Sequence, residues 1–181
     1  MRTLILLFFI FCTSVNSKNL VQKNQLNKLF DQLEKVNNYK TAELLEKKIW
    51  SLWNEHPNNN KLTEKLEFGT ELMQYGDYDY ALKVFNNVLN TDPDWSEAWN
   101  KRATVFFLMN HYKESLDDIE KVLEIESRHF GALSGQARIF IKLQEYEKAI
   151  SSLQTALNFY PLFKSGELIS EIEKLIKEKS V

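Results

Sequence analysis

Side chains of the types that carry out chemistry are few and scattered in this chain of 181 residues. The three histidines are His56, His111 and His129, and none forms a metal-binding arrangement with a second histidine or with carboxylates one helical turn away. Each falls in an expected turn, so we expect exposed histidines without a ligand. The acidic cluster within residues 114–118 is expected on the solvated outer face of a helix.

Sequence motifs for catalysis are missing. The chain has no glycine-rich phosphate loop, no Gly-x-Ser-x-Gly turn and no zinc-binding helix motif. Cys12 is the only cysteine, and it lies in an N-terminal segment that we expect to be removed, so the processed chain would lack disulfides and thiol chemistry. We therefore expect a protein that is not an enzyme and that uses no cofactor and no metal.

A period of 34 residues organises the rest of the chain. Blocks at 62–95, 96–129 and 130–163 carry the same residue classes at the same block positions. Helices that pack about 8–10 Å apart need small side chains where their axes come closest, and larger ones fill the volume beside them. Each block is therefore expected to form two antiparallel helices. The matching residues are Gly69, Ala103 and Ala137 at position 8; Tyr78, Tyr112 and Tyr146 at 17; Ala81, Ser115 and Ala149 at 20; Phe85, Ile119 and Leu153 at 24; Leu89, Leu123 and Leu157 at 28; and Pro93, Ser127 and Pro161 at 32.

This pattern resembles the tetratricopeptide repeat family. Residues 98–103 and 128–135 are in addition similar to segments of small exported tetratricopeptide proteins of proteobacteria. The resemblance implies an all-α fold, a right-handed solenoid of helix hairpins in which each hairpin covers the apolar face of the next.

Residues 18–61 predict a degenerate N-terminal helix hairpin ahead of the three repeats. It breaks at residues 37–38, and Phe30 occupies the position where the repeats have a small residue. Terminal repeats are often irregular because one of their faces has no neighbour.

Beyond the last repeat, residues 164–181 predict a C-terminal cap helix that packs on the second helix of that repeat. Its apolar stripe consists of Leu168, Ile169, Ile172, Leu175 and Ile176. Within the array, Asp94 and Glu97 have the spacing of a capping box for the first helix of the second block.

Residues 1–17 have the pattern of a secretory signal peptide. Arg2 is the positive charge, residues 4–11 are apolar without a break, and small residues follow. Such a run is shorter than the ~20 residues that span a bilayer, so we expect cleavage before Lys18, with an uncleaved anchor as the alternative. A bacterial periplasm is the expected location, and the absence of Asn-x-Ser/Thr sequons adds slight support.

The charge balance argues against several classes of partner. The chain has 23 basic and 25 acidic residues, and no basic patch stands out. We therefore expect no binding of nucleic acid, and no membrane insertion once the signal is cleaved. A protein or peptide is the remaining expected partner.

In the family, ligands are held on the concave wall by the first helix of each repeat, at block positions 2, 5, 9, 12 and 13. For Met73 and Ile141, packing between neighbouring helices is an equal alternative to ligand contact. Phe107 is favoured as a contact residue, because its neighbour Phe106 is expected to fill the core position. The resemblance carries the binding role onto Leu66, Thr70, Met73, Asn100, Thr104, Phe107, Ser134, Arg138 and Ile141.

The carboxylate clamp of chaperone-binding members needs basic residues at block positions 2 and 6, where the third block has Gly131 and Gly135. An extended or helical peptide in a mostly neutral groove is the better expectation. The alternative function is a structural adaptor that docks through its convex face or its cap helix in an envelope-assembly complex.

Overall fold

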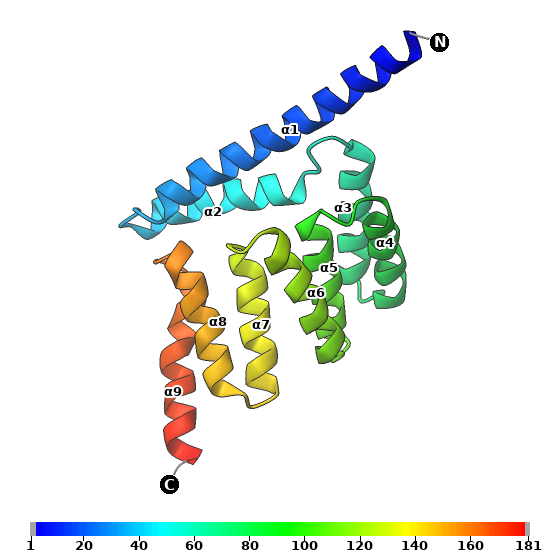
Figure 1. The fold of residues 1–181 in the computed structure, drawn as a ribbon. Coiled ribbons are helices and arrows are strands. Elements are labelled where there is room, and N and C mark those ends of the chain that lie inside the picture. Colours follow the sequence, from blue (N-terminus) through cyan, green and yellow to red (C-terminus); the bar gives the residue numbers. More distant parts are fainter. Residues whose placement is uncertain (1–2, 180–181) are drawn as a thin grey trace.

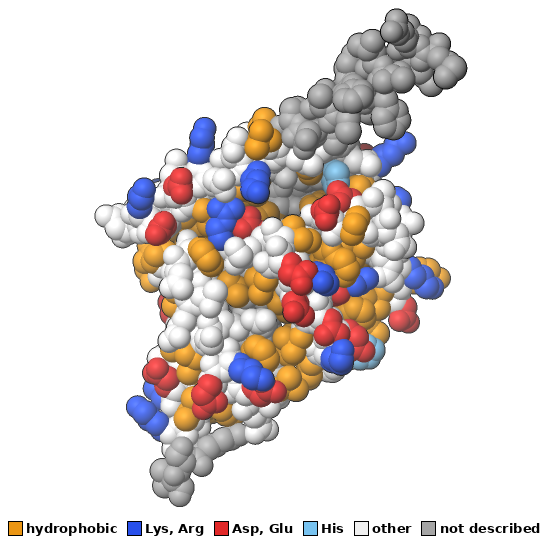
Figure 2. Space-filling model, in the orientation of Figure 1, with side chains coloured by type: hydrophobic (Ala, Val, Ile, Leu, Met, Phe, Trp, Pro, Cys, Tyr) orange, Lys and Arg blue, Asp and Glu red, His pale blue; other side chains and the backbone are white. Residues whose placement is uncertain are grey.

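The computed structural model describes residues 3–179, and over that range the chain consists of helices and turns without a strand (Figure 1). On the face seen in this orientation, acidic and basic side chains are interspersed (Figure 2). Helices α3 to α8 form three antiparallel hairpins that lie side by side, which confirms the predicted all-α solenoid of helix hairpins. The elements are α1 (Thr3–Leu33), α2 (Tyr39–Asn54), α3 (Asn60–Gln74), α4 (Tyr78–Thr91), α5 (Ser96–Leu108), α6 (Tyr112–Ile125), α7 (Phe130–Lys142), α8 (Tyr146–Phe159), the 3₁₀ turn η1 (Lys164–Glu167) and α9 (Leu168–Lys179).

Each hairpin is closed by side chains of complementary size at block positions 8 and 24. In α3–α4 a Cβ on Gly69 would lie only 2.6 Å from the Phe85 ring, so this glycine leaves room for a phenylalanine. The following hairpins use Ala103 with Ile119, and then Ala137 with Leu153, all of which are buried. The repeat with the largest residue at position 24 thus has the smallest residue at position 8, which keeps the interior densely packed.

The three hairpin turns share one backbone conformation. Gly76, Asn110 and Gln144 occupy the same block position, and all have positive φ, at 81°, 61° and 61°. The amide that follows each of them donates to a carbonyl five residues earlier, as in Asp77 to Leu72 at 2.9 Å. This is the Schellman ending of a helix, and it reverses the chain within two or three residues.

The N-terminal hairpin lies across the array rather than at its end. Figure 1 shows α1 and α2 running together over the ends of α7 and α8. The buried residues Phe30 and Trp53 share a cluster with Phe130 at the start of α7 and with Tyr160 just after α8. The hairpin therefore ties the second half of the array together, and the outer face of α3–α4 has no hairpin on it.

At the other end, α9 packs on α8 as the sequence predicted. Ile172 is buried, and Leu168, Ile169 and Ile176 pack around it. Leu175 was expected in the same stripe, but it is 40% exposed and does not belong to this cluster.

The predicted capping box at the start of α5 is wrong. Trp95 occupies the N-cap position, and its side chain makes no capping hydrogen bond. The amide of Asp94 instead donates to Asp92, and the Glu97 side chain turns into the interior, where it is fully buried.

The segment expected to be a signal peptide is helical in its backbone from Thr3 onward, because α1 runs to Leu33 without interruption. Met1 and Arg2 lie outside the described residues. Across the described part of the chain, no helix is both long enough and apolar enough to span a membrane. Cleavage before Lys18 stays a prediction.

Candidate functional site

A hollow of about 380 Å³ opens on the concave side of the array, and we call it the inner hollow. Its walls come from α2, α3, α5, α6 and α7 and from the segment that leads into η1. Six of the nine residues predicted to bind a ligand line it, namely Met73, Asn100, Thr104, Phe107, Ser134 and Arg138. The first helices of the three repeats, α3, α5 and α7, thus line one space, because the 34-residue repeat places them side by side.

The other three predicted residues do not line the inner hollow. Leu66 is 1% exposed and belongs to the core of the first hairpin. The Thr70 hydroxyl donates to the Leu66 carbonyl at 2.7 Å. Ile141 packs with the cluster around α9, so the packing alternative describes it better than ligand contact.

The prediction that Phe106 fills the core position of α5 is wrong. Phe106 and Phe107 are both half-buried, and the buried residue of this segment is Val105. Phe106 lies near the Arg102 guanidinium and the His111 ring, at 5.8 and 6.3 Å. Phe107 lines the inner hollow all the same, and its ring centroid is 6.0 Å from that of Tyr112.

Most polar groups of the inner hollow are already hydrogen-bonded within the protein. The Thr104 hydroxyl donates to the Asn100 carbonyl at 2.9 Å, and the Ser134 hydroxyl donates to Ser165 at 3.1 Å. Arg138 differs, because it is exposed and has no hydrogen-bond or ion-pair partner among the residues that the structure describes. The Arg138 guanidinium is therefore available to bind a negatively charged group of a ligand.

The sequence did not predict the wall that α2 contributes. Glu46 and Trp50 line the inner hollow, and so does Phe163 from the segment before η1. Gly131 carries the signal that could have revealed this wall, because a Cβ there would lie 2.5 Å from the Trp50 ring. A glycine at the first turn of α7 allows α2 to approach closely, in addition to weakening any carboxylate clamp.

Behind that wall lies a buried polar cluster that joins α2, α5 and α7. His129 Nε2 donates to Glu97 Oε2 at 3.0 Å, and both side chains are fully buried. Lys101 Nζ lies 3.0 Å from the other Glu97 oxygen. The Trp53 ring stacks on the imidazole with a centroid distance of 4.0 Å.

The pKa of the Glu97 carboxyl lies below its ordinary value. Burial by itself raises this pKa, but the hydrogen bond from His129 and the charge of Lys101 together outweigh burial. The carboxylate is therefore charged: Oε2 accepts from His129 and from the Asn100 side-chain amide at 3.1 Å, and Oε1 pairs with Lys101. It belongs to the framework behind the inner hollow, and it is not exposed to a ligand.

Two of the three predicted exposed histidines are buried, so that prediction is wrong for His56 and His129. His56 Nε2 lies 2.7 Å from Asp92 Oδ2, and this hydrogen bond lowers the pKa of the Asp92 carboxyl. His111 is exposed, as expected. Helix spacing alone could not reveal either pair, because the partners lie about one repeat apart in sequence.

Comparison with known proteins agrees with this architecture. The family model described as anaphase-promoting complex, cyclosome, subunit 3 matches residues 74–156. A TPR repeat-containing protein of Rhizobium etli is 30% identical over 145 residues, which cover 80% of this chain and 71% of that protein. The chain belongs to the tetratricopeptide repeat family.

More distant relatives match over less of their length. The Hsp70-Hsp90 organizing protein of Triticum aestivum is 24% identical over 115 residues, and the match covers 64% of this chain but only 19% of that protein. This tetratricopeptide protein thus spans about a fifth of that relative.

Solved structures show the same fold at low sequence identity. The first TPR domain of Spaghetti (RPAP3), bound to the HSP90 peptide SRMEEVD, has a TM-score of 0.61 at 19% identity and covers 66% of this chain and 96% of that chain. The Yersinia enterocolitica type III secretion chaperone SycD, in complex with a peptide of the translocator YopD, has a TM-score of 0.59 at 17% identity and covers 70% of this chain and 100% of that chain.

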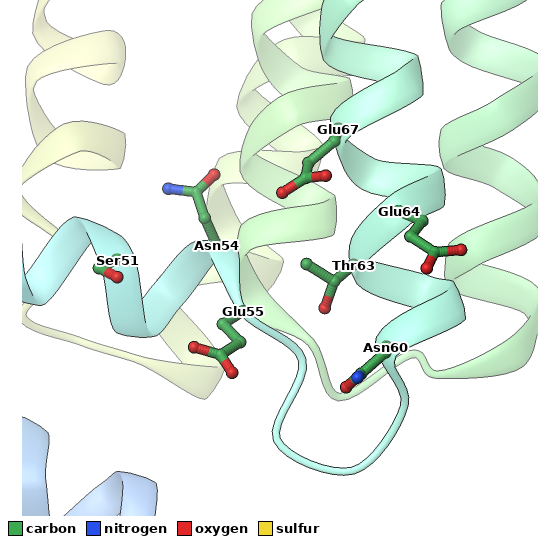
Figure 3. A pocket seen from close by; sticks show the side chains of 7 residues that line it. All are labelled: Ser51, Asn54, Glu55, Asn60, Thr63, Glu64 and Glu67. Atoms are coloured by element: carbon green, nitrogen blue, oxygen red, sulfur yellow. The ribbon is translucent and has the colours of Figure 1, made fainter.

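A second hollow of this tetratricopeptide protein lies between the end of α2 and α3 and is strongly polar. Figure 3 shows that its three carboxylates, Glu55, Glu64 and Glu67, point in different directions. Within the described residues, no group of three or more His, Cys, Asp or Glu side chains could hold a metal ion. This corner carries no candidate site.

The expectation that the acidic cluster on α6 is solvated holds for Glu114 and Asp117 but is wrong for Asp118. Asp118 is 4% exposed and accepts two hydrogen bonds from Arg102, at 2.6 and 2.8 Å. Burial raises the pKa of the Asp118 carboxyl, and the hydrogen bonds from Arg102 only partly offset this.

Proposed function

We propose that this tetratricopeptide protein is a non-enzymatic interaction module that binds a peptide or protein segment in the inner hollow. One observation carries the proposal: the apolar side chains of Met73, Phe107 and Trp50 surround a space whose rim holds the unpaired Arg138. Apolar walls with a few polar groups are typical of ligand sites in proteins.

The shape of the inner hollow supports a particular kind of segment. Trp50 and Phe163 close one side, so a bound segment lies against α5 and α7 rather than along the whole array. A large apolar side chain fits beside Phe107, and a negative group fits beside Arg138. Two structural neighbours, in their own complexes, hold peptides on the same fold.

The buried acid and base support a non-enzymatic role. Glu97 and His129 are both fully buried and bind each other, so neither is available to a substrate in the inner hollow. General acid–base catalysis requires a titratable group within hydrogen-bonding reach of the substrate.

We further propose that the protein works in a bacterial periplasm after removal of residues 1–17, as the N-terminal pattern suggests. Expression of the full chain in a Gram-negative cell, followed by fractionation and N-terminal sequencing, tests this proposal. A periplasmic product that begins at Lys18 supports it. A cytoplasmic product that begins at Met1 contradicts it.

Binding is tested with a random-peptide library selected on the purified chain, followed by fluorescence anisotropy with an enriched peptide. We expect the selected peptides to combine a large apolar residue with an acidic group. In the double variant Phe107→Ala, Arg138→Glu, affinity for such a peptide should fall at least tenfold, while circular dichroism shows that the helical fold is retained at the temperature of the binding assay.

The matched control changes neighbouring residues of the same two helices that do not line the inner hollow. Leu108 and Lys142 are exposed, and the Leu108→Ala, Lys142→Glu variant should bind as tightly as the wild type. Equal loss in both variants, or loss in neither, would contradict binding in the inner hollow. Binding that is lost only on Leu175→Glu would point to docking through α9 instead.

A further inference from the structure

Three charged side chains line the inner hollow, and they differ in how far partners within the protein neutralise them. Lys101 pairs with the buried Glu97 at 3.0 Å, so a carboxylate behind the wall compensates its charge. Arg138 is exposed and, as described above, has no ion-pair partner. The third is Glu46, which α2 contributes. The charges that a ligand meets therefore depend on Arg138 and Glu46.

Glu46 is hydrogen-bonded, but its charge is not neutralised. Its carboxylate accepts from the Tyr160 hydroxyl at 3.0 Å and from Trp50 Nε1 at 3.4 Å, and both donors are neutral groups. Burial, followed by the charge of Glu46, raises the pKa of the Tyr160 hydroxyl, so this donor keeps its proton. Lys164 of η1 interacts with Glu46 at longer range, but it is exposed and pairs with Glu43 at 2.7 Å. Within the described part of the chain, Glu46 thus has no salt bridge of its own.

The two charges lie at different levels along α7. Trp50, the hydrogen-bond partner of Glu46, packs on Gly131 in the first turn of this helix, where α2 crosses it (Figure 1). Arg138 follows Gly131 by seven residues. At 1.5 Å per residue, the two levels are about 10 Å apart along the helix axis. The inner hollow is therefore negative at its α2 end and positive two helical turns away.

Small side chains line the stretch between the two charges. Gly135 and Ala103 lie there, on α7 and α5. The nearest side chain to a Cβ placed on Gly135 would be Ile119, at 3.7 Å. The Asn100 amide and the Thr104 hydroxyl line the same stretch, and both donate hydrogen bonds within the protein. The main chain of a ligand can therefore approach closely here, and the charges at the two ends provide the selectivity.

We propose that the inner hollow selects segments in which an ammonium group and a carboxylate lie about three residues apart, the ammonium bound by Glu46 and the carboxylate by Arg138. This inference rests on the proposed function. In an extended chain three residues span about 10 Å, which matches the two levels on α7. Phe107 lies about one turn further from α2 than the level of Arg138, so the large apolar residue of the segment follows on the carboxylate side.

A segment with carboxylates at both places fits less well. Its second carboxylate would lie beside Glu46, and like charges at close range disfavour such a contact. The ammonium group can come from a lysine side chain or from the first residue of a partner chain, because the two have the same charge and the same donors. The α1–α2 hairpin thereby takes part in binding, in addition to covering α7 and α8.

The first test measures fluorescence anisotropy with labelled nine-residue peptides based on alanine and serine. The parent peptide is acetylated and contains a lysine, two alanines, a glutamate and a leucine in that order. We expect it to bind about fivefold more tightly than the same peptide with norleucine in place of lysine. The advantage should be largest with two or three residues between lysine and glutamate, and it should disappear with none or with six.

A second pair of peptides separates the two sources of the ammonium group. These peptides lack the lysine and begin at its position, and they differ only in whether the first amine is free or acetylated. Tighter binding of the free amine, together with the lysine effect, shows that both sources are accepted. A lysine effect without an effect of the free amine assigns the site to lysine side chains, and the reverse result assigns it to chain termini.

Variants of the protein test whether Glu46 is responsible. Glu46→Gln keeps an oxygen that accepts from Tyr160 but loses the charge, so the preference for lysine over norleucine should fall from about fivefold to none. Glu55→Gln is the matched control, because Glu55 follows α2 and lines the polar hollow of Figure 3 instead. Tyr160→Phe removes the hydrogen bond and leaves the charge. The preference should persist in both of these variants.

The inference is overturned if the norleucine peptide binds as tightly as the parent, if the spacing makes no difference, or if Glu46→Gln keeps the preference. Loss of the preference in Tyr160→Phe as well would assign Glu46 a structural role only, and would also overturn it. In each of these cases, weaker binding by the Phe107→Ala, Arg138→Glu variant leaves the proposed function standing. Binding of none of the peptides contradicts both. Circular dichroism at the assay temperature shows that each variant is folded.

Discussion

His129 and Glu97, which are one repeat apart in sequence, form a hydrogen-bonded pair inside the protein at 3.0 Å. His129 Nδ1 accepts a hydrogen bond from the Ala132 amide, so Nε2 carries the hydrogen that is donated to Glu97. Trp53 of the N-terminal hairpin stacks on the ring. The pair therefore connects α5 to α7. The His129 ring also stacks with Trp53 of α2, and this contact holds the α1–α2 hairpin across the array.

Replacing Glu97 by Gln should remove an acid-dependent part of the stability. Because the pKa of Glu97 is lower in the folded chain than its ordinary value of 4.5, its stabilising contribution is present above that value and is lost as the pH falls further. Urea unfolding of the wild type between pH 3 and pH 6 should show a steeper loss toward low pH than unfolding of Glu97→Gln.

The loss of unfolding free energy in His129→Ala at neutral pH provides a second measurement. His129→Ala leaves the buried carboxylate with Lys101 and the Asn100 side-chain amide as its remaining partners, and breaking a buried pair in this way costs about 3–5 kcal/mol. Curves of unfolding free energy against pH that run parallel in the wild type and in Glu97→Gln would contradict the role given to this pair.

Gly131→Ala should loosen the contact between α2 and α7. A Cβ at this position would lie 2.5 Å from the Trp50 ring, and overpacking of this kind costs about 1–3 kcal/mol. Thermal unfolding and tryptophan fluorescence report the change. Gly135→Ala is the control one helical turn further along, because its Cβ would lie 3.7 Å from Ile119 and would fit without a shift.

If the clash with Trp50 is the cause, Gly131→Ala combined with Trp50→Leu should recover part of the loss, measured against Trp50→Leu alone. Equal melting temperatures for Gly131→Ala and Gly135→Ala would show that α2 does not approach α7 as closely as the structure indicates.

Tyr160→Phe should weaken the contact between α2 and the end of α8. The Tyr160 hydroxyl donates to Glu46 at 3.0 Å, across α8 and α2. Burial, followed by the negative charge of Glu46, raises the pKa of this phenol, so it remains a donor throughout the neutral range. Hydrogen bonds to charged groups contribute about 1.5–3 kcal/mol. Denaturant unfolding should show a loss of this size, and Tyr39→Phe, at an exposed tyrosine of α2, should show none.

The repeats could be predicted from the sequence because each hairpin closes through contacts between residues at fixed separations within one block. The pair Ala103 and Ile119 shows this, since both positions return every 34 residues. The placement of the N-terminal hairpin could not be predicted in the same way. Its contacts, such as Phe30 with Phe130 at 6.3 Å between ring centroids, join residues with no shared period.

The same difference explains which site residues were found. Asn100, Phe107 and Arg138 lie on the inner hollow because block position determines which side of a first helix faces the concave wall. Trp50 was missed because it reaches the inner hollow from outside the array. The buried state of His129 was missed because its partner Glu97 lies at the opposite end of the same block, 32 residues away, and its stacking partner Trp53 belongs to the hairpin.

Size complementarity in the first hairpin gives a final prediction. Gly69→Ala places a Cβ 2.6 Å from the Phe85 ring and should destabilise the protein by about 1–3 kcal/mol. Phe85→Leu alone should also be destabilising, because it leaves a cavity beside the glycine. The double variant recreates the alanine and leucine that the third repeat has at Ala137 and Leu153, so it should be more stable than the sum of the single effects predicts. A double-mutant cycle from urea unfolding measures this coupling, and purely additive effects would contradict the direct contact between the two positions.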